Sequence, residues 1–256
     1  MLWYLYTVTS EDRFLDGTFH RMIDSLPKMA QIFVAYRGFT PEPNAHFAGE
    51  VYMPLATSLS DARNAAMEAF PPAKDVIVAF PDDDCWYPAN LANSVETYLD
   101  SFDFVLGVVD MKGTEGSDFK ESCPVDLALA LTKSASAAMW IKSSFLANFR
   151  FDERLGLGAI FKAGEDLDLV VHVLCDGAIG LFSESIRVGH PLRDRTMEYF
   201  PGSLAVLAKY RHSKISSTWP LIRRLSHGMI FFLTGRLSLS TLLLGFRATL
   251  EGKSKS

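Results

Sequence analysis

Short apolar runs alternate with amphipathic stretches along the first 200 residues of this 256-residue chain, and this alternation most constrains its fold. Apolar runs of strand length lie at residues 2–8, 31–35, 76–80, 104–109, 179–182 and 186–188, and a further strand is expected within 127–141. Helical patterns lie at 16–26, 60–70 and 88–99, and the prolines at 71 and 72 end the second of them. Such an alternation predicts an α/β fold with a doubly wound, mostly parallel sheet.

Composition and missing motifs exclude several classes of protein. The chain is 48% hydrophobic and 21% charged, which allows a sizeable core without disulfides or a structural metal. Its three cysteines form no CxxC pair, and an odd count without a framework is typical of a reducing compartment. No GxxxxGK[ST], GxGxxG, HExxH or GxSxG sequence is present. P-loop kinases, dinucleotide-binding dehydrogenases, zinc peptidases and α/β-hydrolases are therefore disfavoured.

Charge is unevenly distributed along the chain. Residues 203–256 carry nine Lys or Arg and one acid, a net charge of +8, whereas residues 1–202 carry 16 basic and 29 acidic residues, a net charge of −13. We therefore predict two parts, an acidic body over 1–202 and a basic, apolar helical tail over 203–256. Such a tail favours an anionic membrane surface as partner. No nucleic acid is expected, because the acidic body repels phosphate backbones and no nucleic-acid module is recognisable.

The tail alternates apolar clusters with single arginines over residues 219–250. Its longest unbroken apolar run, Met229–Leu233, is far shorter than the ~20 residues of a spanning helix. Two arrangements are open, helices lying on a membrane surface or a helical hairpin packed on the body with its arginines reaching water.

The N-terminal segment Met1–Val8 lacks a basic region and is followed by Glu11 and Asp12, so it predicts a strand rather than a signal peptide. The expected location is cytoplasmic, at the inner face of the cell membrane.

Three adjacent aspartates, Asp82, Asp83 and Asp84, directly follow the apolar run 76–80. Their mutual repulsion is relieved when a divalent cation neutralises them, and hard carboxylate oxygens suit Mg²⁺ or Mn²⁺. The carboxyl end of a parallel strand is also where open α/β sheets bind ligands. Capping of the helix near Pro88 is the alternative, but one aspartate suffices for a cap. The run therefore predicts a site for a cation and a diphosphate.

Two further places carry candidate chemistry. Glu165 and Asp166 begin a predicted helix that Gly177 ends, and the helix dipole alone would stabilise them there. The functional alternative is a general base that takes a proton from an attacking hydroxyl. His190 follows the last predicted strand and is a candidate metal ligand, although a lone histidine is usually structural.

Four segments together resemble bacterial family-two glycosyltransferases. They are Leu59-Ser-Asp-Ala-Arg-Asn64, Phe80-Pro-Asp-Asp-Asp-Cys-Trp-Tyr-Pro88, Phe151-Asp-Glu-Arg-Leu-Gly156 and Gly164-Glu-Asp-Leu-Asp168, in this order. The resemblance covers roughly residues 1–200, and the arginine-bearing tail is similar to tails of membrane-associated members. It implies a GT-A-like fold, a nucleotide-diphosphate-sugar donor, Mn²⁺ or Mg²⁺, inversion at the anomeric carbon and a saccharide or lipid-linked acceptor.

The same resemblance implies a role for each matching residue. Asp82 and Asp84 match the ends of the DxD motif, with Asp82 on the ribose or sugar, Asp83 between them and Asp84 on the metal. Arg63 and Asn64 match a segment that lines the nucleotide pocket, and His190 matches a position that ligates metal in some relatives. Asp166 is the expected base, and Glu165 is a supporting or acceptor-binding group. Trp86 and Tyr87 would shape the sugar pocket or pack in the core.

Two departures from the family pattern concern the donor. The stretch after strand one reads Thr9-Ser-Glu-Asp12 instead of a Pro-Thr-Tyr-Asn-like run, and strand two ends in Val34-Ala-Tyr-Arg37 without the usual aspartate. Asp12 or Tyr36 are candidate substitutes in base recognition. The main alternative function is a catalytically degenerate nucleotide-sugar-binding or scaffold protein on the same fold. A nucleotidyltransferase is disfavoured because its glycine-rich start is absent near Val8.

Overall fold

The structure is a computed structural model that describes residues 1–110, 121–191, 196–213, 215 and 217–251. Its strands are β1 (Trp3–Ser10), β2 (Ala30–Arg37), β3 (Gly49–Met53), β4 (Ile77–Ala79), β5 (Phe104–Asp110), β6 (Ser122–Pro124), β7 (Met139–Lys142) and β8 (Gly180–Gly189). Its α-helices are α1 (Glu11–Leu15), α2 (Thr18–Ser25), α3 (Leu59–Ala69), α4 (Leu91–Leu99), α5 (Leu127–Lys133), α6 (Glu165–Cys175), α7 (Thr196–Lys209), α8 (Thr218–Leu233) and α9 (Leu239–Glu251). Two 3₁₀ turns, η1 (Ser136–Ala138) and η2 (Ser143–Phe145), flank β7.

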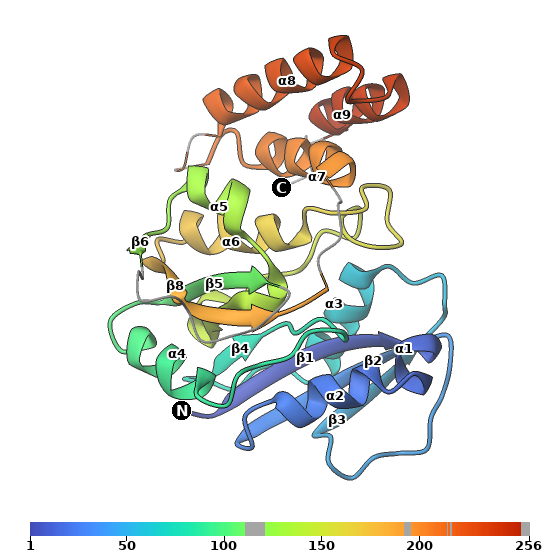
Figure 1. Cartoon of the computed structure of the whole chain (residues 1–256), viewed down its shortest axis with the longest axis vertical. Coiled ribbons are helices and arrows are strands. Elements are labelled where there is room, and N and C mark those ends of the chain that lie inside the picture. Colours follow the sequence, from blue (N-terminus) through green and yellow to red (C-terminus); the bar gives the residue numbers. More distant parts are fainter. Residues whose placement is uncertain (111–120, 192–195, 214, 216, 252–256) are drawn as a thin grey trace.

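The described strands form a mixed sheet in the order β3-β2-β1-β4-β7-β5-β8-β6. Figure 1 shows β1 to β3 on one side of this sheet and β5, β8 and β6 on the other. Strands β1 to β4 pair in parallel, and β5 pairs in parallel with β8. Strand β7 is antiparallel to both β4 and β5, so these two run in the same direction. The carboxyl ends of β1, β4, β5 and β8 therefore meet at one edge of the sheet, where α/β folds bind ligands.

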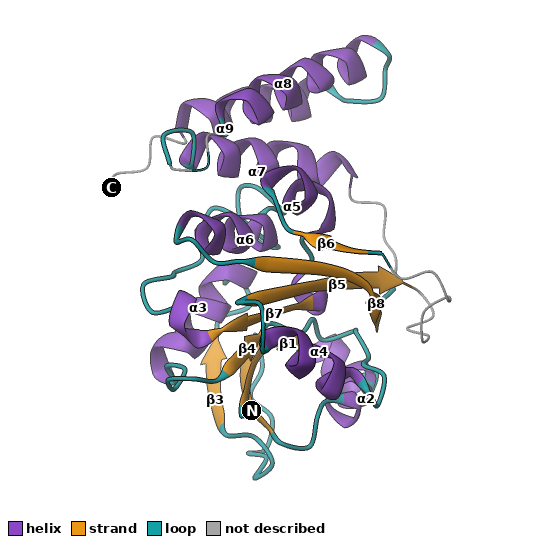
Figure 2. Ribbon diagram, turned by 90° about the vertical axis from the view of Figure 1, so that its left-hand side faces the viewer, coloured by secondary structure: helices purple, strands orange, loops and turns teal. Residues whose placement is uncertain are grey.

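Helices cover both faces of the sheet (Figure 2). Residues of α3, α5, α6 and α7 share one buried cluster, with Phe33 and Phe104 from the sheet. Residues of α2 and α4 share a second cluster, with Trp3 and Trp140 from the sheet. Burial of both sheet faces explains why the central strands read as continuous apolar runs. The predicted α/β, mostly parallel fold with C-terminal helices is confirmed.

Several local predictions differ from the structure. The segment 127–141 begins with helix α5 before β7, and the two late strands expected at 179–188 are one strand, β8. Strands β3 and β6 were not predicted, because both are short and incompletely buried and their apolar patterns are correspondingly weak. The polar, charged and glycine-containing segment Met111–Cys123 predicts a flexible loop over the site. Its residues 111–120 lie outside the described part of the chain, whereas Ser122 and Cys123 belong to strand β6.

The C-terminal helices pack on the body through α7, which both α8 and α9 contact (Figure 1). The ring of Phe200 in α7 fills the space that glycine leaves at two places. A Cβ at Gly228 of α8 would come within 2.1 Å of this ring, and one at Gly245 of α9 within 2.7 Å. The domain boundary predicted after residue 202 falls inside α7. Within the described residues, no helix is both long and apolar enough to cross a bilayer.

Candidate functional site

A cavity of about 600 Å³ opens at the carboxyl edge of the sheet. Its walls include Asp82, Asp83, Asp84, Glu165, Asp166 and His190. These residues come from three separate segments, the chain after β4, the start of α6 and the end of β8. The structure thus brings together the three places that the sequence marked as carrying chemistry.

Arg63 lies behind this cavity, and only 1% of it is exposed. Its Nη2 donates to Asp82 Oδ1 at 3.2 Å and to Ser136 Oγ at 3.0 Å, and its Nη1 donates to Asp166 Oδ1 at 3.4 Å. The guanidinium lies 5.8 Å from the ring centre of Phe80 and 5.4 Å from that of Phe151. One buried cation therefore connects the carboxylate after β4 to the carboxylate at the start of α6.

Asn64, the neighbour of Arg63 on α3, is buried and does not line this cavity. Its Nδ2 donates to the carbonyl of Phe151 and its Oδ1 accepts from the amide of the same residue, both at 2.9 Å. Arg63 does not line the cavity either, since it acts from beneath. We predicted that Arg63 and Asn64 line the nucleotide pocket. In the structure, both lie behind the cavity wall instead.

His190 closes the site from the end of β8. Its Nε2 lies 3.0 Å from Asp84 Oδ1 and 3.5 Å from Asp82 Oδ2, while its Nδ1 lies 2.8 Å from the carbonyl oxygen of Pro191. Because a carbonyl only accepts, Nδ1 carries a hydrogen and donates to it. Burial lowers the pKa of His190, but its hydrogen bonds to Asp82 and Asp84 outweigh this and raise it to about 10. A proton or a cation must therefore lie between Nε2 and Asp84.

Glycine at position 189 makes this placement possible. The backbones of Trp86 and Gly189 exchange two hydrogen bonds of 2.9 Å, and a Cβ at Gly189 would come within 1.9 Å of the indole ring. Trp86 thus packs on the backbone beside His190. Tyr87 is buried, and its hydroxyl donates to the carbonyl of Ala137 at 2.9 Å, so it packs in the core.

The donor set fits a divalent cation bound together with a phosphate ligand. Among the described residues, no three His, Cys, Asp or Glu side chains are already arranged around a cation position. Asp84 and His190, however, converge through a carboxylate oxygen and an imidazole nitrogen whose other nitrogen is fixed by Pro191. Mg²⁺ and Mn²⁺ are commonly held by one or two protein ligands, with phosphate oxygens and waters completing the shell.

Glu165 and Asp166 begin α6 beside the cavity. Only 8% of Glu165 is exposed, and its Oε2 has no hydrogen-bond partner in the described structure. Burial, aided by the charge of Asp166, raises the pKa of Glu165 to about 8. Burial also raises the pKa of Asp166, against the lowering effect of Arg63. An Asp with a raised pKa is better suited to accept a proton near neutrality.

Asp82 and Asp83, the first two aspartates of the run after β4, have pKa shifts in opposite directions. Burial, with the charge of Asp84 second, raises the pKa of Asp83 to about 6. Burial also opposes ionisation of Asp82, but the hydrogen bond from His190 and the charge of Arg63 outweigh it and lower the pKa of Asp82. Two of the three aspartates in the run thus face cations of the protein itself, since Arg13 Nη2 also lies 2.8 Å from Asp84 Oδ2.

Sequence reasoning missed several residues of the site. Arg13 follows α1's acidic first turn, Ser136 lies in η1, and Arg224 lines the cavity from α8. No local pattern marks these residues, because tertiary folding alone brings them to the cavity.

Neither of the two residues predicted to replace the missing aspartate in base recognition lines the cavity. Asp12 is exposed, and Tyr36 is buried with its hydroxyl donating to Glu50 at 2.9 Å. Arg37, at the end of β2, does line the cavity.

Comparisons with solved structures find the same fold in glycosyltransferases. TarS of S. aureus aligns with a TM-score of 0.68 at 13% identity, covering 100% of this chain and 50% of TarS. TarS 1–349 in complex with UDP-GlcNAc aligns with a TM-score of 0.67 at 13% identity over 98% of this chain and 80% of that one. GalNAc-T7 with UDP, GalNAc and Mn²⁺ aligns with a TM-score of 0.54 at 15% identity over 81% of this chain and 47% of that one.

These likenesses establish a GT-A-like fold. This chain spans half the length of full TarS. No protein-family profile matches the sequence, and no curated protein matches it.

Proposed function

We propose that this protein is a metal-dependent, inverting glycosyltransferase that moves a sugar from a nucleotide-diphosphate donor to a hydroxyl of a glycan or lipid-linked acceptor. The observation that carries the proposal is the bridge of Arg63 between Asp82 and Asp166. It joins a donor-binding carboxylate and a candidate base through the two terminal nitrogens of one guanidinium, beside one cavity. The complexes of the similar folds with UDP, UDP-GlcNAc and Mn²⁺ add support.

On the donor side, Asp82 and Asp83 bind the nucleotide sugar, and Asp84 and His190 hold Mn²⁺ or Mg²⁺. When bound, the cation neutralises charge on the diphosphate leaving group. To hold a cation, His190 would need its Nε2 unprotonated, and the hydrogen bond from Nδ1 to the carbonyl of Pro191 favours that tautomer of the neutral ring. Arg13 remains on the second oxygen of Asp84 and keeps this carboxylate oriented.

On the acceptor side, Asp166 takes the proton of the attacking hydroxyl. The hydroxyl oxygen then forms a bond to the anomeric carbon as the bond to the diphosphate oxygen breaks, and a single displacement of this kind inverts the configuration. Arg63 holds Asp166 in position, and Glu165, being largely protonated at neutral pH, limits the negative charge beside it. Surface polysaccharide or glycolipid biosynthesis is the proposed role.

The outer faces of α8 and α9 support a peripheral location at the cytoplasmic face of the membrane. They expose large apolar side chains at helical spacing, Trp219, Ile222, Ile230 and Leu233 on α8 and Leu239, Leu243, Phe246 and Leu250 on α9. The same segment carries the net positive charge of the tail. Apolar faces with nearby cations bind anionic lipid headgroups, so the packed hairpin and the surface-bound helices are compatible.

A thermal-shift screen tests the proposal with UDP, GDP, dTDP and CMP, each with Mn²⁺, Mg²⁺ or a chelator. A ligand present at about 100 times its Kd adds about 2.7 kcal/mol to the stability of the folded state. We expect one diphosphate nucleotide to raise the melting temperature only with metal. Asp84→Asn should abolish this rise, and Asp24→Asn, at an exposed aspartate of α2, should retain it. No shift with any nucleotide would favour the degenerate scaffold.

A further inference from the structure

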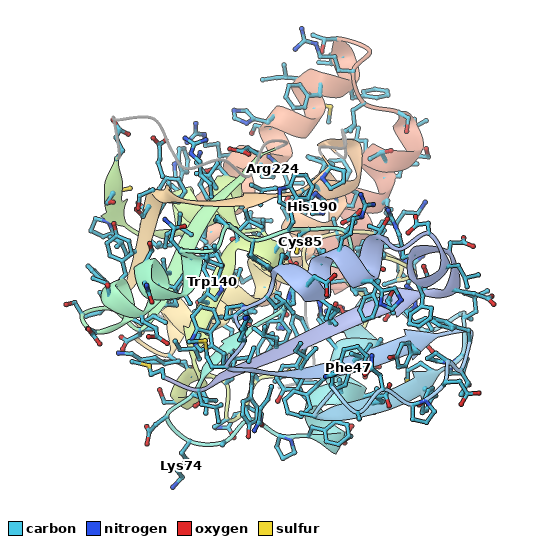
Figure 3. All side chains as sticks on the ribbon, turned by 60° about the horizontal axis from the view of Figure 1, so that its bottom comes forward. Phe47, Lys74, Cys85, Trp140, His190 and Arg224 are labelled. Atoms are coloured by element: carbon cyan, nitrogen blue, oxygen red, sulfur yellow. The ribbon has the colours of Figure 1, made fainter. Side chains whose placement is uncertain are left out.

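The tail supplies one guanidinium to the wall of the cavity. Arg224 lies on α8, is half-buried and lines the cavity together with Tyr199 and Ser203 of α7. Its Nε donates to Ser203 Oγ at 3.1 Å, and its Cζ lies 5.8 Å from the ring centre of Phe200. Figure 3 labels Arg224 and His190 where the C-terminal helices meet the carboxyl edge of the sheet.

Arg224 has no countercharge in the described part of the chain. Three of the five carboxylates that line the cavity already face other cations, since Asp82 and Asp166 pair with Arg63 and Asp84 pairs with Arg13. Burial lowers the pKa of Arg224, and no carboxylate opposes that effect. A partly desolvated charge is costly without a partner, so the site is suited to an anion supplied by a ligand.

The position of Arg224 assigns this anion to the acceptor. Its partner Ser203 follows Gly202, and a Cβ at Gly164 would come within 3.0 Å of Gly202. Gly164 is the residue before Glu165, so the Arg224–Ser203 pair adjoins the start of α6, where Asp166 lies. The donor diphosphate belongs instead with Asp84 and His190. The acceptor must reach Asp166 to lose its proton and therefore passes beside Arg224.

We propose that Arg224 forms an anion subsite for the acceptor, which carries a phosphate or carboxylate group close to its attacking hydroxyl. This inference rests on the proposed function. A guanidinium offers two parallel N–H donors that match the oxygens of either group. Gly228, one turn after Arg224, lets α8 pack closely on the ring of Phe200 in α7, the helix that carries Ser203. The tail thereby completes the acceptor site in addition to facing a membrane.

Isothermal titration of the full-length protein tests the subsite with glycerol 3-phosphate, glucuronate and glycerol as probes. Each titration is made with the protein saturated with UDP and Mn²⁺, and again without them. Arg224→Gln removes the charge, and Arg224→Lys keeps the charge but removes the two parallel N–H donors. Arg223→Gln changes the exposed neighbouring arginine and is the matched control. Circular dichroism and melting temperature confirm that each variant is folded.

We expect an anionic probe to bind the wild type, and glycerol not to bind. Arg224→Gln should weaken the anion about tenfold or more, Arg224→Lys by less, and Arg223→Gln less than about twofold. A preference between glycerol 3-phosphate and glucuronate then identifies the group as phosphate or carboxylate. Equal anion affinity in wild type and Arg224→Gln, equal losses in Arg224→Gln and Arg223→Gln, or no binding of either anion would overturn the inference.

The two proposals fail in different ways. If UDP does not bind the wild type, the proposed function fails, while the titrations without UDP still compare the Arg224 and Arg223 variants. If UDP binds with metal and the anions bind Arg224→Gln as tightly as the wild type, the subsite fails and the proposed function stands.

Discussion

Lys209 Nζ lies 2.8 Å from each carboxylate oxygen of Asp168, and Asp168 is fully buried. Asp168 is two residues beyond Asp166 on α6, and Lys209 ends α7, the helix that carries Ser203. The pair therefore fixes the helix of the candidate base against the helix on which the C-terminal hairpin packs. Although burial raises the pKa of Asp168, the charge of Lys209 opposes this shift.

Lys209→Met should destabilise the protein strongly, because it leaves a buried carboxylate without its cation. Breaking a buried ion pair by removing one partner costs about 3–5 kcal/mol, measured here as the free energy of unfolding in urea. The double variant Asp168→Asn with Lys209→Met should recover part of this loss. Lys162→Met, at an exposed lysine, is the control and should change stability little. A loss below about 1 kcal/mol would show that the pair contributes no more than an exposed one.

Arg63→Gln should impair both stability and turnover, because Asp82 and Asp166 lose the cation that they share. The loss of stability should be larger at about pH 8 than at about pH 5, since more of the unpaired carboxylates are charged at the higher pH. A displaced base should lower the rate of transfer about 100-fold. Arg150→Gln, which breaks only exposed pairs with Glu68 and Glu153, is the comparison and should behave like the wild type. Equal melting temperatures and rates for the two variants would contradict the bridging role.

Glu165 should make stability depend on pH between its ordinary pKa of 4.5 and its raised pKa of about 8. The folded protein binds more protons than the unfolded chain in this window, so this contribution to stability is complete below pH 4.5 and is lost as pH rises toward 8. The slope for one proton is at most about 1.4 kcal/mol per pH unit. Glu165→Gln removes the titration, and its unfolding free energy should decline less over this window than that of the wild type. Parallel pH profiles of the two proteins would refute the assignment.

The contributions of sequence and tertiary structure can be compared at particular residues. Residues 76–80 are buried on both faces of the sheet, so their apolar run correctly predicts a central strand. Because the aspartates follow this strand directly, a parallel sheet puts them at its carboxyl edge. Glu165 and Asp166 were placed at a helix start by the apolar period that follows them. These features are local in sequence, and the structure bears out their positions.

The missing parts of the site depend on contacts between distant segments. Arg63 and Asn64 are neighbours on α3, yet one joins two carboxylates and the other holds the backbone of Phe151. Arg224 lines the cavity from α8, a helix that packs on α7 where Phe200 meets Gly228. A pattern of residue types along one chain carries no signal for such contacts, so their roles became visible only with the fold.

The final prediction concerns the apolar outer face of the C-terminal hairpin. Cutting the chain after Gly202 would divide α7 and expose its core side, so substitutions are the better probe. Leu233 and Leu250 are 75% and 76% exposed, and replacing both with Asn should leave the fold intact. Because burying one such side chain yields about 1.5–3 kcal/mol, losing two should weaken co-sedimentation with phosphatidylglycerol vesicles at least about tenfold.

Leu55→Asn is the matched control, since Leu55 is 67% exposed on the body, far along the chain from the hairpin. It should bind vesicles like the wild type. Phosphatidylcholine vesicles and high salt should both reduce wild-type binding, because the cations of the tail then lose their anionic partners. If the Leu233 and Leu250 double variant partitions as the wild type does, this face does not contact lipid. The apolar side chains of α8 and α9 would then need a protein partner to explain their exposure.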